Sequence, residues 1–103
     1  MIEDRDMDAV FQALANDSRR RMLDIVKNEP GIRVGELASE FDVSRIAVMK
    51  HIAVLQTARL VVSEKDGRTR RLYFNAAPIQ MIHERWTTEY SAYWAGQMTR
   101  IKY

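Results

Sequence analysis

A capped helix followed by a tight hairpin constrains the fold of this chain most strongly. Ser44 is placed to cap a helix that runs to about Ala58, because a serine hydroxyl at that position accepts a hydrogen bond from a first-turn amide. The inward stripe of this helix is Val48, Ile52 and Leu55. Residues 60–65 and 69–74 alternate or are β-branched, and they flank Asp66-Gly67, a two-residue hairpin signal.

Shorter helices are expected before this unit. The first spans Asp8 to about Ala15, and the second spans Ser18 to about Lys27 with Asp17 as its cap. Residues 32–41 indicate a third, short helix, with Arg33 at a cap position where it offers no acceptor oxygen. Pro78 opens a last helix, whose apolar and aromatic residues recur three or four apart at Ile79, Ile82, Trp86, Tyr90 and Tyr93. This order predicts a mostly α fold with a small β-hairpin, a winged helix-turn-helix.

Length and composition indicate one domain over residues 1–103. The absence of cysteine excludes disulfides, thiolate metal sites and thiol redox sensing through this chain. No apolar run is long enough to span a bilayer and no signal-peptide pattern opens the sequence, so a cytoplasmic protein without membrane contact is expected. The sequence offers few residues for catalysis, so an enzyme is not expected. It has two histidines, His51 and His83, and no glycine-rich phosphate loop.

Charge is segregated along the chain. Residues 45–71 hold seven basic and two acidic side chains, a net +5, whereas residues 1–17 hold five acids and one arginine, a net −4. Such segregation favours one positive face for a polyanion. A solvated basic surface is the alternative that charge alone leaves open.

The candidate nucleic-acid contacts lie on the helix after Ser44 and on the hairpin. Arg45 suits the guanine edge, Ile46 or Met49 suits thymine methyl groups, and Ser44, Lys50 and His51 suit phosphate oxygens. The hairpin cations suit the phosphate backbone or the adjacent minor groove, and they are Lys65, Arg68, Arg70 and Arg71. Two structural alternatives stay open: a hydrogen bond of His51 within the protein, and charges that protect an edge strand from aggregation.

The first and last helices are rich in large apolar side chains. A core of this size is not expected to cover all of these rings, so we expect a homodimer paired across a two-fold axis. The candidate interface residues are Val10, Phe11, Leu14, Trp86, Tyr90 and Tyr93. Intramolecular packing alone is the alternative.

Three motifs give the chain a family resemblance. Residues 13–23 resemble the "AL(A/S)DPTRRxIL" opening of ArsR-type winged-helix repressors, residues 34–38 and 43–55 resemble "VGELA…VSQPAVSKHLxVL", and residues 67–73 resemble the "GRRRxY" wing. The similarity covers about residues 9–100 and is greatest with the metal-independent branch, whose members are often autoregulatory. It implies the order helix, helix, strand, helix, helix, strand, strand, helix, and a homodimer that binds a palindromic operator in double-stranded DNA.

Several positions depart from this family. Arg45 and Ile46 replace Gln and Pro, and Met49 replaces Ser or Thr, so base preference does not transfer. The cysteine pair of metal-sensing members falls at Ala38 and Glu40 here, and a lone histidine beside a carboxylate in the last helix is not a convincing site.

The sequence therefore predicts a DNA-binding transcriptional repressor with no metal and no cofactor. Three alternatives stay open: a winged helix used for protein contact, a repressor released by a small apolar ligand or a partner protein, and an activator.

Overall fold

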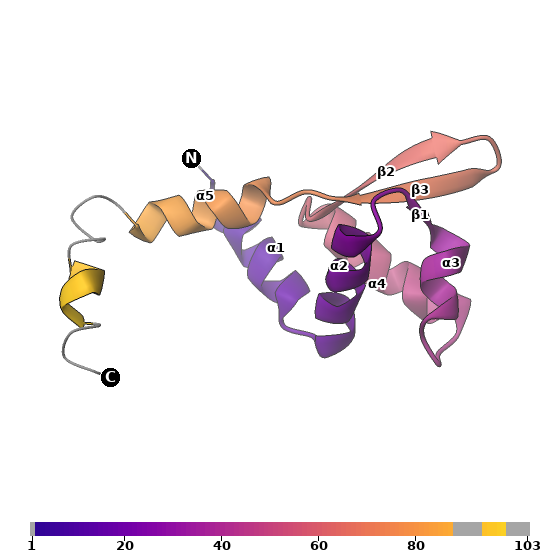
Figure 1. Ribbon diagram of the computed structural model, residues 1–103, viewed down its shortest axis with the longest axis horizontal. Helices are drawn as coiled ribbons and strands as arrows, with labels where there is room; N and C mark the ends of the chain where they lie inside the picture. Colours follow the sequence, from indigo (N-terminus) through magenta and orange to yellow (C-terminus); the bar gives the residue numbers. More distant parts are fainter. Residues whose placement is uncertain (1, 88–93, 99–103) are drawn as a thin grey trace.

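The computed structural model describes residues 2–87 and 94–98. Its elements are α1 (Asp4–Leu14), α2 (Asp17–Asn28), β1 (Ile32–Arg33), α3 (Val34–Ser39), α4 (Arg45–Thr57), β2 (Val61–Asp66), β3 (Thr69–Phe74) and α5 (Ala77–Trp86). The hairpin extends from one end of the helical body and α5 from the other (Figure 1). The mostly α architecture and the element order expected from the sequence are both confirmed. Within the described ranges, no helix is long and apolar enough to cross a membrane.

Two side-chain caps fix where α2 and α4 begin. The Ser44 side chain accepts a hydrogen bond from the Ala47 amide at 3.1 Å, as predicted. For α2 the cap is Asn16 rather than Asp17, and the Asn16 side chain accepts from the Arg19 amide at 3.1 Å. Asn16 has the extended backbone that a cap needs, whereas Asp17 is already helical. The helix start predicted from the sequence was therefore one residue late.

The short helix predicted over residues 32–41 is divided in the structure. Ile32 and Arg33 form strand β1, which pairs antiparallel with β3, and α3 begins only at Val34. The Arg33 backbone amide donates a hydrogen bond to the Glu36 carboxylate at 3.0 Å. The Arg33 side chain has no acceptor atom, so it cannot cap the first turn of α3 in return. The sheet has the order β1-β3-β2. The β1 pairing therefore anchors the middle of β3 to the helix-turn-helix.

The hairpin turn lies one residue later than predicted. Asp66 pairs with Thr69, so the loop residues are Gly67 and Arg68 rather than Asp66 and Gly67. Gly67 has φ +64°, and glycine at the first loop position is the pattern of a type II′ turn. The turn therefore places Arg68 at the tip and leaves Asp66 on the strand.

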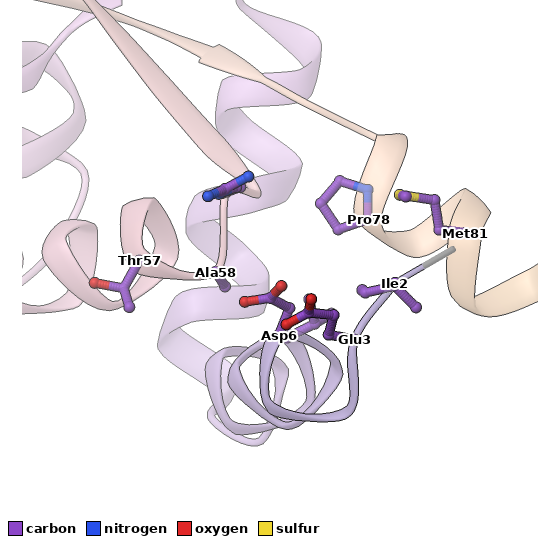
Figure 2. Close-up of a pocket in the computed structure, with 9 residues that line it drawn as sticks. Ile2, Glu3, Asp6, Thr57, Ala58, Pro78 and Met81 are labelled. Atoms are coloured by element: carbon purple, nitrogen blue, oxygen red, sulfur yellow. The ribbon is translucent and has the colours of Figure 1, made fainter.

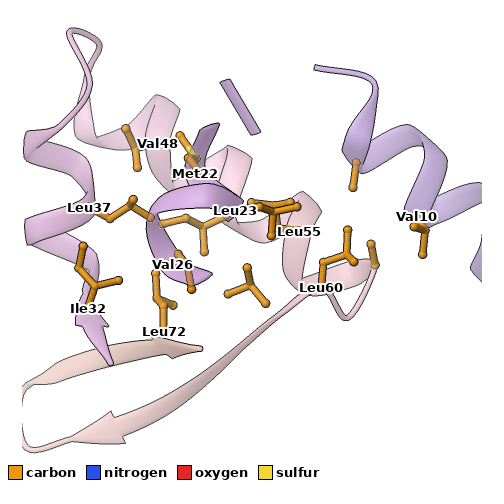
Figure 3. Packing of buried hydrophobic residues seen from close by; sticks show 14 of the residues in the cluster. Val10, Met22, Leu23, Val26, Ile32, Leu37, Val48, Leu55, Leu60 and Leu72 are labelled. Atoms are coloured by element: carbon orange, nitrogen blue, oxygen red, sulfur yellow. The ribbon is translucent and has the colours of Figure 1, made fainter. Parts of the chain in front are cut away.

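The core lies between the helices and the inner face of the sheet (Figure 3). The stripe of α4 that the sequence predicted to face inward is buried, and so are Met22, Leu23 and Val26 of α2. Leu72 of β3 is fully buried against them. Val10 also belongs to this core, with 1% of its surface exposed, so it does not share an exposed face with Phe11. The α1 residues that face inward are Met7, Val10 and Ala13.

The last helix begins as predicted and ends earlier. Pro78 lies in the first turn of α5, and α5 ends at Trp86. Residues 94–98 are helical. The predicted interface residues Tyr90 and Tyr93 lie outside the described residues. The Arg85 guanidinium lies 3.0 Å from the Asp4 carboxylate and joins α5 to the start of α1.

Candidate nucleic-acid interface

A groove separates the first turns of α4 from the wing, which we define as residues 61–74. The groove has a volume of about 550 Å³. It is lined by Arg33, Val34, Gly35, Glu36, Arg45, Met49, Arg68, Thr69 and Arg70. Four of these nine residues are arginines and one is acidic, so the groove is strongly positive.

Helix α4 presents an unusual mixture of side chains beside this groove. One face of α4 is buried in the core, so the opposite face is exposed to solvent. On that face Ile46 is 71% exposed and Met49 is 45% exposed. Arg45 and Lys50 are exposed on the same half of the helix. Val43, just before the cap, is also 56% exposed, although it is not among the DNA contacts predicted from the sequence. Large apolar side chains exposed between cations are typical of a binding surface rather than of a solvated one. They suit a partner that presents both apolar groups and hydrogen-bond acceptors.

Like charges meet on one face of the wing. Lys65 and Arg70 are direct cross-strand partners, and among the described residues neither forms an ion pair. Arg70 donates a long hydrogen bond of 3.3 Å to the Ser63 hydroxyl. Like charges opposite each other destabilise a strand pair, and a polyanion bound at this face would relieve the repulsion.

Arg71 has a different environment from Arg70. Its Nε donates to Asp66 Oδ2 at 2.6 Å, and its Nη1 donates to the Gly31 carbonyl at 3.0 Å. The hydrogen bond from Arg71, with its positive charge, lowers the pKa of the Asp66 carboxyl below its ordinary value of 3.8. The same hydrogen bond raises the pKa of the Arg71 guanidinium. Arg71 thus ties the hairpin to the turn that precedes β1.

His51 is held from within the protein. The Arg19 guanidinium of α2 lies 3.2 Å from His51 Nδ1, which is the internal hydrogen bond that the sequence analysis kept as an alternative. The Ser44 hydroxyl also has a structural role, because its oxygen caps α4. Its hydrogen remains available to donate a hydrogen bond to another group.

Sequence reasoning missed Arg33 as a groove residue. Its only signal was its cap position before α3, where a basic residue gives no helix cap. Arg33 sits at the junction of β1 and α3, pairs with Arg71 of the wing and lines the groove. The structure therefore adds one cation to the predicted set.

The candidate dimer residues divide between surface and interior. Phe11 is 48% exposed and Trp86 is 57% exposed, so both are available to a partner. Leu14 is partly buried against the core, and Val10 is buried within it, so neither is an exposed interface residue. Ile79 and Met81 of α5 add further exposed apolar surface.

A second cavity, of about 250 Å³, lies between the start of α1, the end of α4 and the start of α5 (Figure 2). Its walls are apolar at Ile2 and Pro78, but Glu3 and Asp6 line it with carboxylates and Arg59 adds a guanidinium. Such charged walls do not suit a purely apolar ligand. Within residues 2–87 and 94–98, no three His, Cys, Asp or Glu side chains lie close enough together to hold a metal ion.

A helix-turn-helix with a basic wing defines a class of transcriptional regulators, and comparisons with known proteins agree. Residues 16–72 match the model of the MarR family, which is more than half of the chain, so the chain belongs to the MarR family. It is a winged helix-turn-helix transcriptional regulator and not an enzyme.

Individual relatives support this assignment. The chain is 46% identical over 69 residues to the HTH-type transcriptional regulator Rv2034 of Mycobacterium tuberculosis, a match that covers 67% of this chain and 63% of that protein. It is 35% identical to the uncharacterized HTH-type transcriptional regulator YuzN of Bacillus subtilis, over 77% of this chain and 92% of that protein. Among solved structures, the ArsR family transcriptional regulator RHA00566 superposes with a TM-score of 0.75 at 30% identity, covering 91% of this chain and 95% of that one.

Proposed function

We propose that the chain is a sequence-specific double-stranded DNA-binding repressor that acts as a homodimer. The observation that carries this proposal is the positive groove, in which Arg33, Arg45, Arg68 and Arg70 surround an exposed Met49. A protein-contact surface of this size normally has fewer charges at its centre, whereas a DNA interface is strongly positive.

In this proposal α4 enters the major groove and α3 braces it. Arg45 pairs with the O6 and N7 atoms of a guanine, and Ile46 and Met49 contact thymine methyl groups. Lys50 and the Ser44 hydroxyl bind phosphate oxygens, which set the register of the helix without reading sequence. The 71% exposure of Ile46 supports this assignment because no described neighbour covers it.

The wing follows the adjacent backbone or minor groove. We propose phosphate contacts for Lys65, Arg68 and Arg70, supported by the unpaired Lys65–Arg70 juxtaposition. For Arg71 we propose a modified role. The Arg71 guanidinium already donates to the Asp66 carboxylate and to the Gly31 carbonyl. Its main role in this proposal is therefore to orient the wing, not to bind a phosphate.

Pairing of two copies through α1 and α5 covers exposed apolar surface. Phe11 and Trp86 are the described residues that we propose at this interface, together with Tyr90 and Tyr93. Two-fold symmetry places two α4 helices on successive major grooves, about 34–36 Å apart, so the operator is palindromic. All of residues 1–103 act as one domain in this arrangement.

The resemblance to ArsR-type repressors and the RHA00566 likeness support an ArsR-type assignment within this class. We propose that DNA release does not require a metal and that the signal is a small molecule or a partner protein. For a bacterial-type repressor of this kind we propose that the protein acts in the cytoplasm.

The test is binding to duplex DNA from upstream of the protein's own gene, at two salt concentrations, with and without a chelator. Tight, salt-sensitive binding that a random duplex does not match supports an autoregulatory, metal-independent repressor. Loss of binding on chelation contradicts metal independence. Salt-insensitive binding no tighter than to random duplex favours a winged helix that contacts protein.

A further inference from the structure

Arg19 links three helices through one guanidinium. Its Nε donates to the Ala13 carbonyl at 2.8 Å and its Nη2 donates to the Gln12 carbonyl at 2.9 Å, both at the end of α1. Its Nη1 reaches His51 Nδ1 on α4 at 3.2 Å. The guanidinium is therefore held by two carbonyls of α1 in addition to the histidine.

This contact decides which nitrogen of His51 carries the proton. A guanidinium donates and never accepts, so His51 Nδ1 must accept the hydrogen bond with its lone pair. The neutral ring then carries its proton on Nε2. Without Arg19, both neutral tautomers are open to the ring.

His51 Nε2 is not fully buried, and it belongs to α4, the helix that carries the proposed DNA contacts. Nε2 has no hydrogen bond to any described residue, and no buried side-chain nitrogen or oxygen in the described ranges lacks a partner, so Nε2 is not enclosed. His51 follows Lys50 on α4 and lies on the flank that faces α2, whereas Arg45 and Met49 lie on the flank that faces the wing groove. The Nε2–H group is thus a donor at the edge of α4 away from the wing.

We infer that Arg19 is a positioning residue that fixes His51 as an Nε2–H donor to a backbone phosphate. The inference rests on the proposed DNA-binding function and assigns a role to an α2 residue that does not itself touch DNA. In this arrangement the wing and His51 contact the DNA phosphate backbone on opposite flanks of α4. A neutral donor of this kind positions the helix on DNA without adding to counterion release.

The tautomer is measured in the free protein. Imidazole ¹⁵N shifts are recorded at about pH 8, above the ordinary histidine pKa of about 6.5, and the His51 signals are assigned by their loss in His51→Gln. We expect a single Nε2–H tautomer in the wild type and a tautomer mixture in Arg19→Met. Arg20→Met is the matched control, because Arg20 caps α1 through the Leu14 carbonyl and does not contact His51. A mixture or an Nδ1–H tautomer in the wild type overturns the role of Arg19.

DNA binding then separates the two ring nitrogens of His51. The amide nitrogen of Gln takes the approximate place of Nε2, whereas Asn carries its polar groups near Nδ1 only. We expect His51→Gln to keep binding within about threefold and His51→Asn to weaken it by about three- to tenfold per subunit, the size of one net hydrogen bond. The slope of affinity against salt stays unchanged in both variants.

Arg19→Met should reproduce the loss seen in His51→Asn, and Arg20→Met should not. Equal binding by His51→Asn and wild type, or equal losses in the Asn and Gln variants, refutes the phosphate contact. A wild-type protein that binds no duplex refutes the proposed function and this contact together. The tautomer measurement, made without DNA, then still decides whether Arg19 sets the ring.

Discussion

Arg70→Gln and Arg71→Gln remove the same charge from adjacent positions of β3, but we expect them to affect DNA binding differently. Arg70 lines the groove and is the cross-strand partner of Lys65. The Arg71 guanidinium, in contrast, donates hydrogen bonds to Asp66 and Gly31. If Arg70 neutralises one phosphate per subunit, the dimer loses two counterion-releasing contacts when it is replaced. Arg71 is already paired, so its replacement should leave the number of phosphate contacts unchanged.

The magnitude follows from counterion release. Each phosphate contact adds about 0.9 to the slope of log affinity against log salt, so Arg70→Gln should flatten the slope by about 1.8 for a dimer. Between about 50 mM and 200 mM salt, this reduces the salt-induced loss of affinity by about twelvefold relative to wild type. Arg71→Gln should keep the wild-type slope, with weaker binding at every salt concentration because the wing is less well oriented.

Fluorescence anisotropy of a labelled operator duplex, titrated at four or more salt concentrations, measures both slopes. Circular dichroism of both variants is the control for folding. Equal flattening by the two variants would refute the reasoning, because it would mean that the Asp66 contact does not withdraw Arg71 from the phosphate backbone. An unchanged slope in Arg70→Gln would remove this residue from the interface.

Three further predictions test other parts of the account. Arg45→Ala should cost about 1–3 kcal/mol of binding free energy and relax preference at one base pair; unchanged affinity and base preference in a selection experiment would show that α4 is misplaced. Trp86→Glu should shift sedimentation toward monomer, and an unchanged dimer would remove the described end of α5 from the interface. By ¹³C NMR, the Asp66 carboxyl should titrate below 3.8 in the wild type and move upward in Arg71→Gln. Since a depressed carboxyl pKa stabilises the folded state above the unfolded pKa, the contribution of this pair should be complete near neutral pH and be lost as pH falls below 3.8 through the folded value.

Much of the fold could be predicted because local signals and burial agree. The Ser44 cap, the α4 core stripe and the glycine of the hairpin each depend on neighbours in sequence, and each is found in the structure. The errors arose where two local solutions compete or where a residue distant in sequence decides the structure. Asn16 and Asp17 both carry a cap oxygen, and only backbone geometry selects Asn16. Ile32 has a helical pattern but pairs with Leu72, forty residues away, which no local pattern reveals.

The candidate interface was harder to predict for the same reason. Exposure of Ile46 and Met49 follows from the helical period, so these positions could be read from the sequence. The division of labour between Arg70 and Arg71 depends on strand register and on the Gly31 carbonyl, which only the folded chain brings together. The Arg19–His51 contact joins residues 32 positions apart and likewise required the structure.

Sequence reading by α4 and the wing can be tested by selection from a pool of random duplexes with the purified protein, followed by sequencing. We expect enrichment of a palindromic motif whose half-sites are centred about 10 base pairs apart, because two-fold related α4 helices occupy successive major grooves. Enrichment of no motif, under conditions where the protein is folded and dimeric, would contradict the claim that α4 and the wing read DNA sequence.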